Sequence, residues 1–247
     1  KFREKIQGAD RRFEELLAKS ESPVAKKQFG RLVVAYQLLP TGSAISLRKL
    51  RDVIHQSEIR ASGWPFWMVQ DGSDADTHPK DQALESFEIS SGSWNGIDYW
   101  YAEPTGFFYA TRALMEDVGD KLPASPQSLE WIWPIKEIGE VILHAAKVAT
   151  LLGIAVEQIR LFVQYKGLEG RVLWNASPTR IAGPFRRYQC HISEWSRYVE
   201  IPTPVRRETL PETVRSILGP LYEQFDLFEM PVGAYVRELA ELTRGSG

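Results

Sequence analysis

The longest regular pattern in the chain is an apolar stripe that runs from Pro134 to Gly153. Its apolar side chains recur at spacings of three and four residues, which is typical of an α-helix that buries one face. The opposite side of this helix carries Lys136, Glu137, Glu140, His144 and Lys147. Gly153 is a typical helix stop, because glycine readily adopts the left-handed conformation found there. The pattern therefore predicts a long central helix with one buried face and one polar face.

Strand patterns flank this helix on both sides. Every second residue from Ile159 to Tyr165 is apolar, with Arg160, Phe162 and Gln164 between them, which predicts a half-buried strand. The glycine-containing segment 166–170 then predicts a turn into a second strand. An aromatic-rich hairpin is predicted from 97–102 and 106–111, around a Pro-Thr-Gly turn. These patterns predict an α+β fold, with mixed or antiparallel sheet(s) packed against a long central helix and C-terminal helices.

Apolar stripes also predict helices near both ends of the chain. Residues 1–19 carry a narrow stripe, and residues from Leu210 onward carry a second, which Gly219 and Pro220 are expected to bend. A last helix is predicted over 232–242. Its inward-facing side chains are expected to be Val232, Tyr235, Val236, Leu239 and Leu242.

Length and composition permit one large domain or two small lobes. The chain has 247 residues and is 43% hydrophobic, which is enough to bury a full core. A Pro- and Ser-containing connector follows Leu122 and marks the best internal boundary. We therefore expect an N-terminal helix or linker over 1–30, a first lobe over 31–122 and a second lobe over 123–247.

Charge and cysteine content exclude several classes of protein. The formal net charge is −2, so no overall basic field attracts nucleic acid. Cys190 is the single cysteine, which excludes an internal disulfide and favours a reducing, cytoplasmic compartment. No unbroken apolar run approaches the roughly 20 residues that cross a bilayer. We therefore expect no membrane partner.

Aromatic side chains are concentrated between residues 64 and 109. Such side chains pack a sheet against a helix, form a surface for a protein partner, or stack on bases or a small ligand. If they are exposed, they supply the apolar area of a contact surface. The candidate binding residues are Trp64, Trp67, Trp94, Tyr99, Trp100 and Phe108.

Acidic residues suggest two alternatives that involve metal ions. A polar loop contains Asp71, Asp74, Asp76, His78 and Asp81, but it lacks the ligand spacing of a calcium-binding loop, so we expect a mobile surface loop without a metal. A metal-dependent hydrolase or nuclease would instead need distant carboxylates to converge. The candidates for that arrangement are Asp98, Glu103, Glu116, Asp117 and His191.

The motifs of common cofactor enzymes are missing from the sequence. It has no P-loop, dinucleotide-binding glycine fingerprint, nucleophile elbow or zinc-protease histidine pair. Cys190 and His191 are adjacent, so in a strand they project to opposite faces, and we expect a structural cysteine. We therefore predict no cofactor and assign no catalytic residue.

Basic residues around the predicted second hairpin give a third interpretation, in which one sheet surface contacts phosphates. Interspersed acids at Glu157, Glu169 and Glu194 weaken it. The basic residues concerned are Arg160, Lys166, Arg171, Arg186 and Arg187.

Several short motifs carry a family resemblance. They are Ser62-Gly63-Trp64-Pro65-Phe66-Trp67, Asp98-Tyr99-Trp100, Gly106-Phe107-Phe108-Tyr109, Trp133-Pro134-Ile135 and Tyr165-Lys166-Gly167-Leu168-Glu169-Gly170-Arg171. In this succession the chain resembles, after about residue 30, the C-terminal region of bacterial proteins that carry an N-terminal AlbA-type (Schlafen-like) DNA-binding domain.

The resemblance implies an accessory role. It predicts a non-catalytic sensor or protein-interaction module of a larger nucleic-acid-acting, regulatory or antiviral-defence protein, and it supplies no catalytic residues. The AlbA-like domain is not part of this sequence, which starts at Lys1. We therefore expect contacts with a protein partner or with an upstream domain of the same chain. Nucleic acid would be bound through that missing domain.

Overall fold

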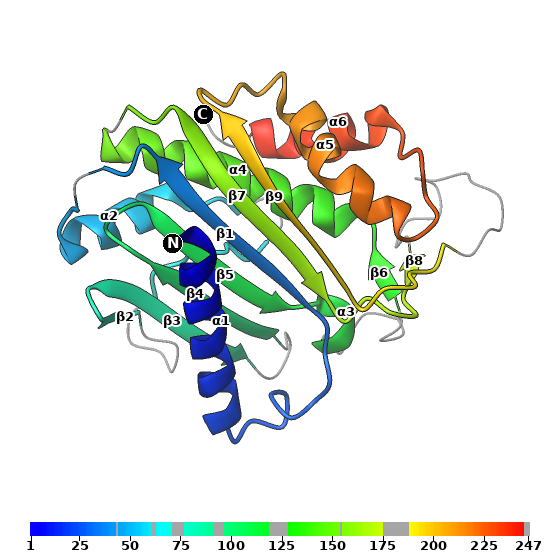
Figure 1. Cartoon of the computed structure of the whole chain (residues 1–247), viewed down its shortest axis with the longest axis horizontal. Helices are drawn as coiled ribbons and strands as arrows, with labels where there is room; N and C mark the ends of the chain where they lie inside the picture. The colour runs from blue at the N-terminus through cyan, green and yellow to red at the C-terminus, as the bar shows by residue number, and fades with distance from the viewer. Residues whose placement is uncertain are drawn as a thin grey trace.

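Seven strands form one antiparallel sheet that organises the molecule (Figure 1). The computed structural model describes residues 1–42, 44–60, 63–70, 77–90, 96–118, 128–153, 155–174 and 188–244. The sheet order is β2-β3-β4-β5-β1-β7-β9, and helices cover it, so the predicted α+β class is confirmed. The strands are β1 (Arg31–Leu39), β2 (His78–Lys80), β3 (Ala83–Ser90), β4 (Gly96–Ala102), β5 (Phe107–Ala113), β7 (Gln158–Lys166) and β9 (Glu194–Pro202).

Six helices accompany the sheet in the described chain, and two further strands form a small parallel pair. The pair consists of β6 (Ser128–Glu130) and β8 (Val172–Trp174). The helices are α1 (Phe2–Lys19), α2 (Leu47–Ser57), α3 (Met115–Val118), α4 (Ile132–Leu152), α5 (Leu210–Glu223) and α6 (Val232–Arg244).

Strand β1 lies inside the sheet, between β5 and β7, and is buried on both faces. Its Leu32, Val34 and Tyr36 belong to the core shared with α2, α4, α5 and α6. Its Val33 and Ala35 face the other way, into a core shared with α1. Successive side chains of a strand point to opposite faces, so this Val- and Leu-rich strand joins two cores.

Helix α1 covers the second face of the sheet, as Figure 1 shows. Its stripe buries Ile6, Ala9 and Phe13. Ion pairs tie its polar side to the sheet: Lys5 Nζ lies 2.6 Å from Glu103, and Arg12 Nη2 lies 2.7 Å from Glu85. The predicted N-terminal helix is therefore an integral layer of the fold.

Helix α4 ends where the sequence predicts, but the acidic and histidine side chains on its predicted polar side are buried. Gly153 caps it in the left-handed conformation at φ 66°. Glu137, Glu140 and His144 are at most 8% exposed. The expectation of a polar face is wrong for these three residues, because α4 contacts β1, α2, α5 and α6. Lys147, on the same side, is exposed as expected.

The predicted second hairpin does not form. Strand β7 pairs with β1 and β9, and β8 pairs in parallel with β6. Gly167 sits at φ 73°, and a Cβ atom there would lie 2.8 Å from the Cα of Gly30. The turn is therefore present, but the chain leaves the main sheet after it.

Both predicted lobes contribute to the same sheet. Strands β1 to β5 come from residues 31–122, and β7 and β9 come from 123–247. The boundary at 122/123 lies outside the described residues, and it does not separate two sheets. Among the described helices, none is both long and apolar enough to span a lipid bilayer.

Candidate functional site

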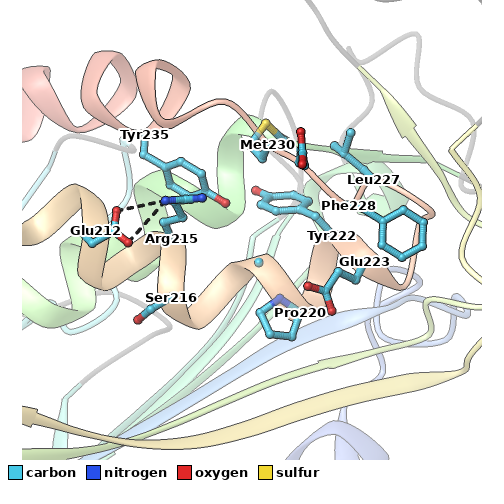
Figure 2. A pocket seen from close by; sticks show the side chains of 12 residues that line it. Glu212, Arg215, Ser216, Pro220, Tyr222, Glu223, Leu227, Phe228, Met230 and Tyr235 are labelled. Atoms are coloured by element: carbon cyan, nitrogen blue, oxygen red, sulfur yellow. Dashed lines mark hydrogen bonds and ion pairs between the residues drawn. The ribbon is translucent and has the colours of Figure 1, made fainter.

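A surface groove opens between α5, α6 and the segment that joins them (Figure 2). It has a volume of about 290 Å³. Helix α5 begins at Leu210. Pro211 fits in its first turn, where proline is well tolerated. Asp226 adopts φ 60° shortly after the helix ends, so the chain turns before it reaches α6. This turn separates the two helices and places the connecting segment at the rim of the groove.

Two tyrosines from different helices form the floor of the groove. Tyr222 is buried, and its hydroxyl donates a 2.7 Å hydrogen bond to the carbonyl of Trp131. Tyr235 is also fully buried, but its hydroxyl has no hydrogen-bond partner among the described residues. Figure 2 shows Tyr235 extending from α6 toward the middle of the lining residues. A buried hydroxyl without a partner is costly, so the groove contains one unused polar group.

The rim combines an exposed aromatic ring with acidic side chains. Phe228 is 69% exposed. Arg215 Nη1 lies 3.3 Å from a carboxylate oxygen of Glu212, so these two charges are matched (Figure 2). Glu223 and Glu229 also line the groove and are exposed. Within the described chain no ion pair engages either of them.

The most strongly perturbed histidine lies elsewhere, on α4. The Nδ1 atom of His144 lies 2.9 Å from the hydroxyl of Tyr36, and its Nε2 atom lies 3.0 Å from Ser57 Oγ. Trp67 stacks on the imidazole with ring centroids 4.4 Å apart. Burial lowers the pKa of His144 to about 3, so the ring is neutral at physiological pH. Ser57 is fully buried, so this Ser-His contact is part of the core rather than an accessible nucleophile.

A buried guanidinium organises a second polar cluster. Arg112 Nε donates to Asp98 at 3.0 Å, and Nη1 lies 3.9 Å from Glu137. Arg112 also donates to the carbonyls of Trp64 and Pro65 and lies over the ring of Phe66 at 3.9 Å. Burial raises the pKa of Glu137 to about 8, although Arg112 opposes this shift. Arg112 thus holds the segment containing Trp64 against the sheet and α4.

Comparison of this chain with family models, with curated proteins and with solved structures finds no match.

Most of the aromatic side chains predicted to form a contact surface are buried instead. Trp67, Tyr99, Trp100 and Phe108 are at most 4% exposed. Phe108 stacks on Tyr36, Trp67 donates to the carbonyl of Tyr109, and Tyr99 donates to Glu85. Tyr99, Trp100 and Phe108 pack the core because the hairpin β4–β5 lies inside the sheet, with a neighbouring strand on each side. Trp67 lies outside that hairpin and is covered by its ring contacts with Phe108 and His144.

Two of the predicted aromatic residues have a different outcome. Trp64 is 45% exposed, so it remains available for contact. Trp94 lies outside the described residues. Of the predicted surface, only Trp64 is therefore shown to be exposed.

The predicted acidic candidates are divided among separate partners. Asp98 pairs with Arg112, Glu103 pairs with Lys5, and Asp117 pairs with Arg171. Glu116 is buried and accepts a 2.7 Å hydrogen bond from the backbone of Glu130. The adjacent Glu116 and Asp117 thus use their carboxylates to fix backbone and a neighbouring cation.

Within the described ranges, no three His, Cys, Asp or Glu side chains are placed to hold a metal ion. In the predicted polar loop, Asp71, Asp74 and Asp76 lie outside those ranges. His78 lies 3.2 Å from Glu85, and Asp81 pairs with Lys80.

The described basic residues of the predicted phosphate-binding surface also pair with separate acidic residues. Arg160 pairs with Glu200 at 2.8 Å, and Lys166 pairs with Asp10 at 3.0 Å. The prediction that Arg171 belongs to an exposed basic surface is wrong, because this side chain is only 4% exposed. It donates hydrogen bonds to Asp117 and to two backbone carbonyls. Arg186 and Arg187 lie outside the described residues.

Cys190 is buried, and burial raises the pKa of its thiol. Its Sγ atom lies 3.5 Å from the carbonyl of Ile192. A thiol with a raised pKa is mostly protonated and therefore a poor nucleophile. This supports the structural role predicted for the cysteine, and His191 beside it is exposed.

Sequence reasoning missed the α5–α6 groove. It predicted that Tyr235, Leu239 and Leu242 face inward, and all three are buried. It also predicted that Val232 and Val236 face inward, and this is wrong, since they are 42% and 51% exposed. The apolar stripe of α6 is wider than the surface that α4 and α5 cover. The width of this stripe is the sequence signal that could have indicated a contact surface on α6, although not the groove itself.

Proposed function

We propose that this chain is a non-catalytic protein-interaction module, and that the α5–α6 groove with its apolar border binds a segment of a protein partner. The observation that carries this proposal is the exposed Phe228 beside a groove whose floor contains the unpartnered hydroxyl of Tyr235. An aromatic ring at the edge of a concave surface is the kind of anchor on which protein interfaces depend.

The distribution of exposed apolar side chains supports a surface at this end of the molecule. Five large apolar side chains of the described chain are exposed, and three of them are Phe228, Val232 and Val236. Val232 and Val236 are one turn apart on α6, so they share a face. Isolated exposed apolar residues are ordinary, whereas a group of them marks an interaction site.

The resemblance to proteins with an AlbA-type, Schlafen-like domain supports a wider proposal. In it, the module serves a larger nucleic-acid-acting, regulatory or defence protein, and its partner is another protein or an upstream domain of the same chain. The nucleic-acid contacts belong to that upstream domain. The pairing of Arg160, Lys166 and Arg171 with acids accords with this division.

A site-specific photocrosslinker tests the proposal. Benzoylphenylalanine is placed at Phe228 in one sample and at Tyr198 in another, because Tyr198 is 41% exposed but lies on β9 away from the groove. Any protein crosslinked from position 228 is then purified, and its affinity for the unmodified chain is measured by calorimetry. We expect Phe228→Ala to weaken this affinity about 30-fold, as for a residue worth about 2 kcal/mol at an interface.

The control variant for this measurement is Tyr198→Ala, which is expected to leave the affinity unchanged. The proposal fails if position 228 yields no crosslinked protein, if both positions crosslink the same proteins equally, or if Phe228→Ala binds as tightly as the wild type.

A further inference from the structure

We infer that the segment bound in the α5–α6 groove is basic, and that the groove receives a lysine or arginine side chain beside Glu223 and Glu229 with the Tyr235 hydroxyl as a further hydrogen-bond partner. This inference rests on the proposed function and names the chemistry of the partner. It draws on three independent features of the groove: its charge, its buried polar group and its apolar rim.

The charge of the groove is unbalanced. Three carboxylates line it, from Glu212, Glu223 and Glu229, against the single guanidinium of Arg215. Arg215 is matched by Glu212 through two contacts of 3.3 and 3.4 Å. Glu223 and Glu229 are left without an ion pair in the described chain, and both are exposed to solvent. A cationic ligand complements this arrangement, whereas an anionic ligand is repelled by it.

The Tyr235 hydroxyl is a second feature that points to a ligand. It is fully buried and unpartnered, while the neighbouring Tyr222 hydroxyl has a backbone acceptor. Burial raises the pKa of Tyr235 well above its ordinary value, so the phenol stays neutral. A neutral hydroxyl accepts N–H donors and also donates one hydrogen bond. An ammonium or guanidinium group reaching the floor supplies such donors.

The apolar part of the groove suits the stem of a long cationic side chain. Leu227, Phe228 and Met230 line it next to the carboxylates. Lysine and arginine lay their methylene stems along apolar surface while their charged ends reach polar groups. The exposed ring of Phe228 also offers its face to a cation. A purely apolar segment would contact the apolar rim but leave the carboxylates unpaired. An acidic segment would be repelled by those carboxylates.

Three synthetic peptides test the charge preference. They have equal length and the same leucine and tyrosine content, and their remaining positions are all lysine, all glutamine or all glutamate. Fluorescence anisotropy measures their affinity for the whole chain. We expect the lysine peptide to bind about fivefold more tightly than the glutamine peptide, the glutamate peptide to bind weakest, and the lysine preference to shrink with added salt.

A charge-neutralised variant identifies the residues responsible. Glu223→Gln with Glu229→Gln is expected to abolish the difference between the lysine and glutamine peptides. The matched control changes Glu4 and Glu21 to glutamine, because both are exposed glutamates of the N-terminal segment that covers the opposite face of the sheet. This control is expected to retain the full lysine preference.

A pair of tyrosine variants separates ligand binding from folding. Tyr235→Phe removes a hydroxyl without a partner, so we expect an unchanged or raised Tm together with a several-fold weaker affinity for the lysine peptide. Tyr222→Phe removes a hydroxyl that holds Trp131, so we expect its Tm to fall by about 2–4 °C. Unchanged peptide affinity in Tyr235→Phe would contradict the role given to this hydroxyl.

The outcomes distinguish the inference from the function on which it rests. Equal binding of the lysine and glutamine peptides, with both lost in Phe228→Ala, overturns the basic preference and leaves the groove as a protein-binding site. Absence of lysine-peptide binding also overturns the inference, while the crosslinking result at position 228 separately decides the proposed function.

Discussion

Several buried charges in the described part of the chain form ion pairs that join different elements. Arg12 of α1 reaches Glu85 of β3, whose side chain is fully buried. Arg171 pairs with Asp117 of α3 and also donates to the carbonyl of Ser128. Removing one partner of such a pair leaves an uncompensated charge in a poorly hydrated place. These residues therefore stabilise the fold, and their carboxylates already form ion pairs within the chain.

Glu85→Gln is expected to lower the free energy of unfolding at neutral pH by about 2 kcal/mol. The value is below the usual cost of breaking a buried pair, because Arg12 keeps 27% of its side chain exposed. Glu15→Gln is the matched control, since Glu15 also pairs with Arg12 but is 61% exposed. We expect the control to change stability by less than about 0.5 kcal/mol. Urea unfolding of the three proteins measures both values.

The effect of Glu85→Gln depends on pH in a defined direction. Burial raises the pKa of Glu85, but the Arg12 hydrogen bond and charge outweigh it, so the net shift is below the ordinary value of 4.5. The unfolded state therefore takes up a proton first as the pH falls. The stabilisation is complete above about pH 4.5 and is lost as the pH drops through the lower folded-state pKa. A stability difference between wild type and variant that grows under acid conditions would contradict this assignment.

At the scale of elements, the close approach of α4 and α6 positions the groove. Gly139 of α4 faces Leu239 and Leu242 of α6, and a Cβ atom at position 139 would lie 2.4 Å from a methyl carbon of Leu239. Both leucines are buried, so they have little room to move. The glycine lets α6 sit close to α4 and thereby sets where Tyr235 lies.

Gly139→Ala is expected to destabilise the protein by about 1–2 kcal/mol despite the better helix propensity of alanine, because it overpacks the helix contact. Gly8→Ala on α1 is the matched control: nothing lies within 4 Å of its added Cβ atom, so we expect a stabilisation of up to about 1 kcal/mol. Thermal unfolding of both variants checks the opposite signs. Equal stabilisation by the two substitutions would show that α4 and α6 are not in close contact.

At the scale of the whole molecule, the central strand pair crosses the predicted lobe boundary. Strand β1 pairs with β5 on one side and with β7 on the other, over nine residue pairs with β7 from Arg31–Lys166 to Leu39–Gln158. Residues 1–122 alone would expose the edge of β1 and the core face that α4 covers. Residues 123–247 alone would leave β7 and β9 as a two-stranded sheet, which is marginal in water.

We therefore expect neither half of the chain to unfold cooperatively when it is produced alone, and we expect the two halves to restore one cooperative transition when they are produced together. Circular dichroism with heating measures each sample. A cooperative transition in either isolated half would support the two-lobe organisation predicted from the connector after Leu122.

Much of the local structure was predictable because short-range patterns decide it. The central helix and its Gly153 stop follow from an apolar period and a residue that tolerates positive φ. The hairpin β4–β5 follows from alternation around a turn, and Gly106 in that turn adopts φ 84°. The inward residues Tyr235 and Leu239 follow from their spacing on α6.

The errors share one physical cause, which is that burial depends on neighbours far away in sequence. The spacing places Glu137 and His144 on a polar face, yet their partners Arg112 and Tyr36 lie on β5 and β1. Trp100 is in the core because its strand pairs on both sides. The groove could not be predicted, since it depends on how closely α5 and α6 approach α4.

The sequence by itself determined the α+β class, the helix and strand patterns, and the residues at which the central helix and the aromatic hairpin turn. Local backbone preferences and apolar periodicity are sufficient for these features. Only the tertiary structure decided which strands became neighbours, which aromatic rings were covered, and that Phe228, Val232 and Val236 stayed exposed. Those outcomes are set by long-range packing, which assigns one residue type to the core in one place and to the surface in another.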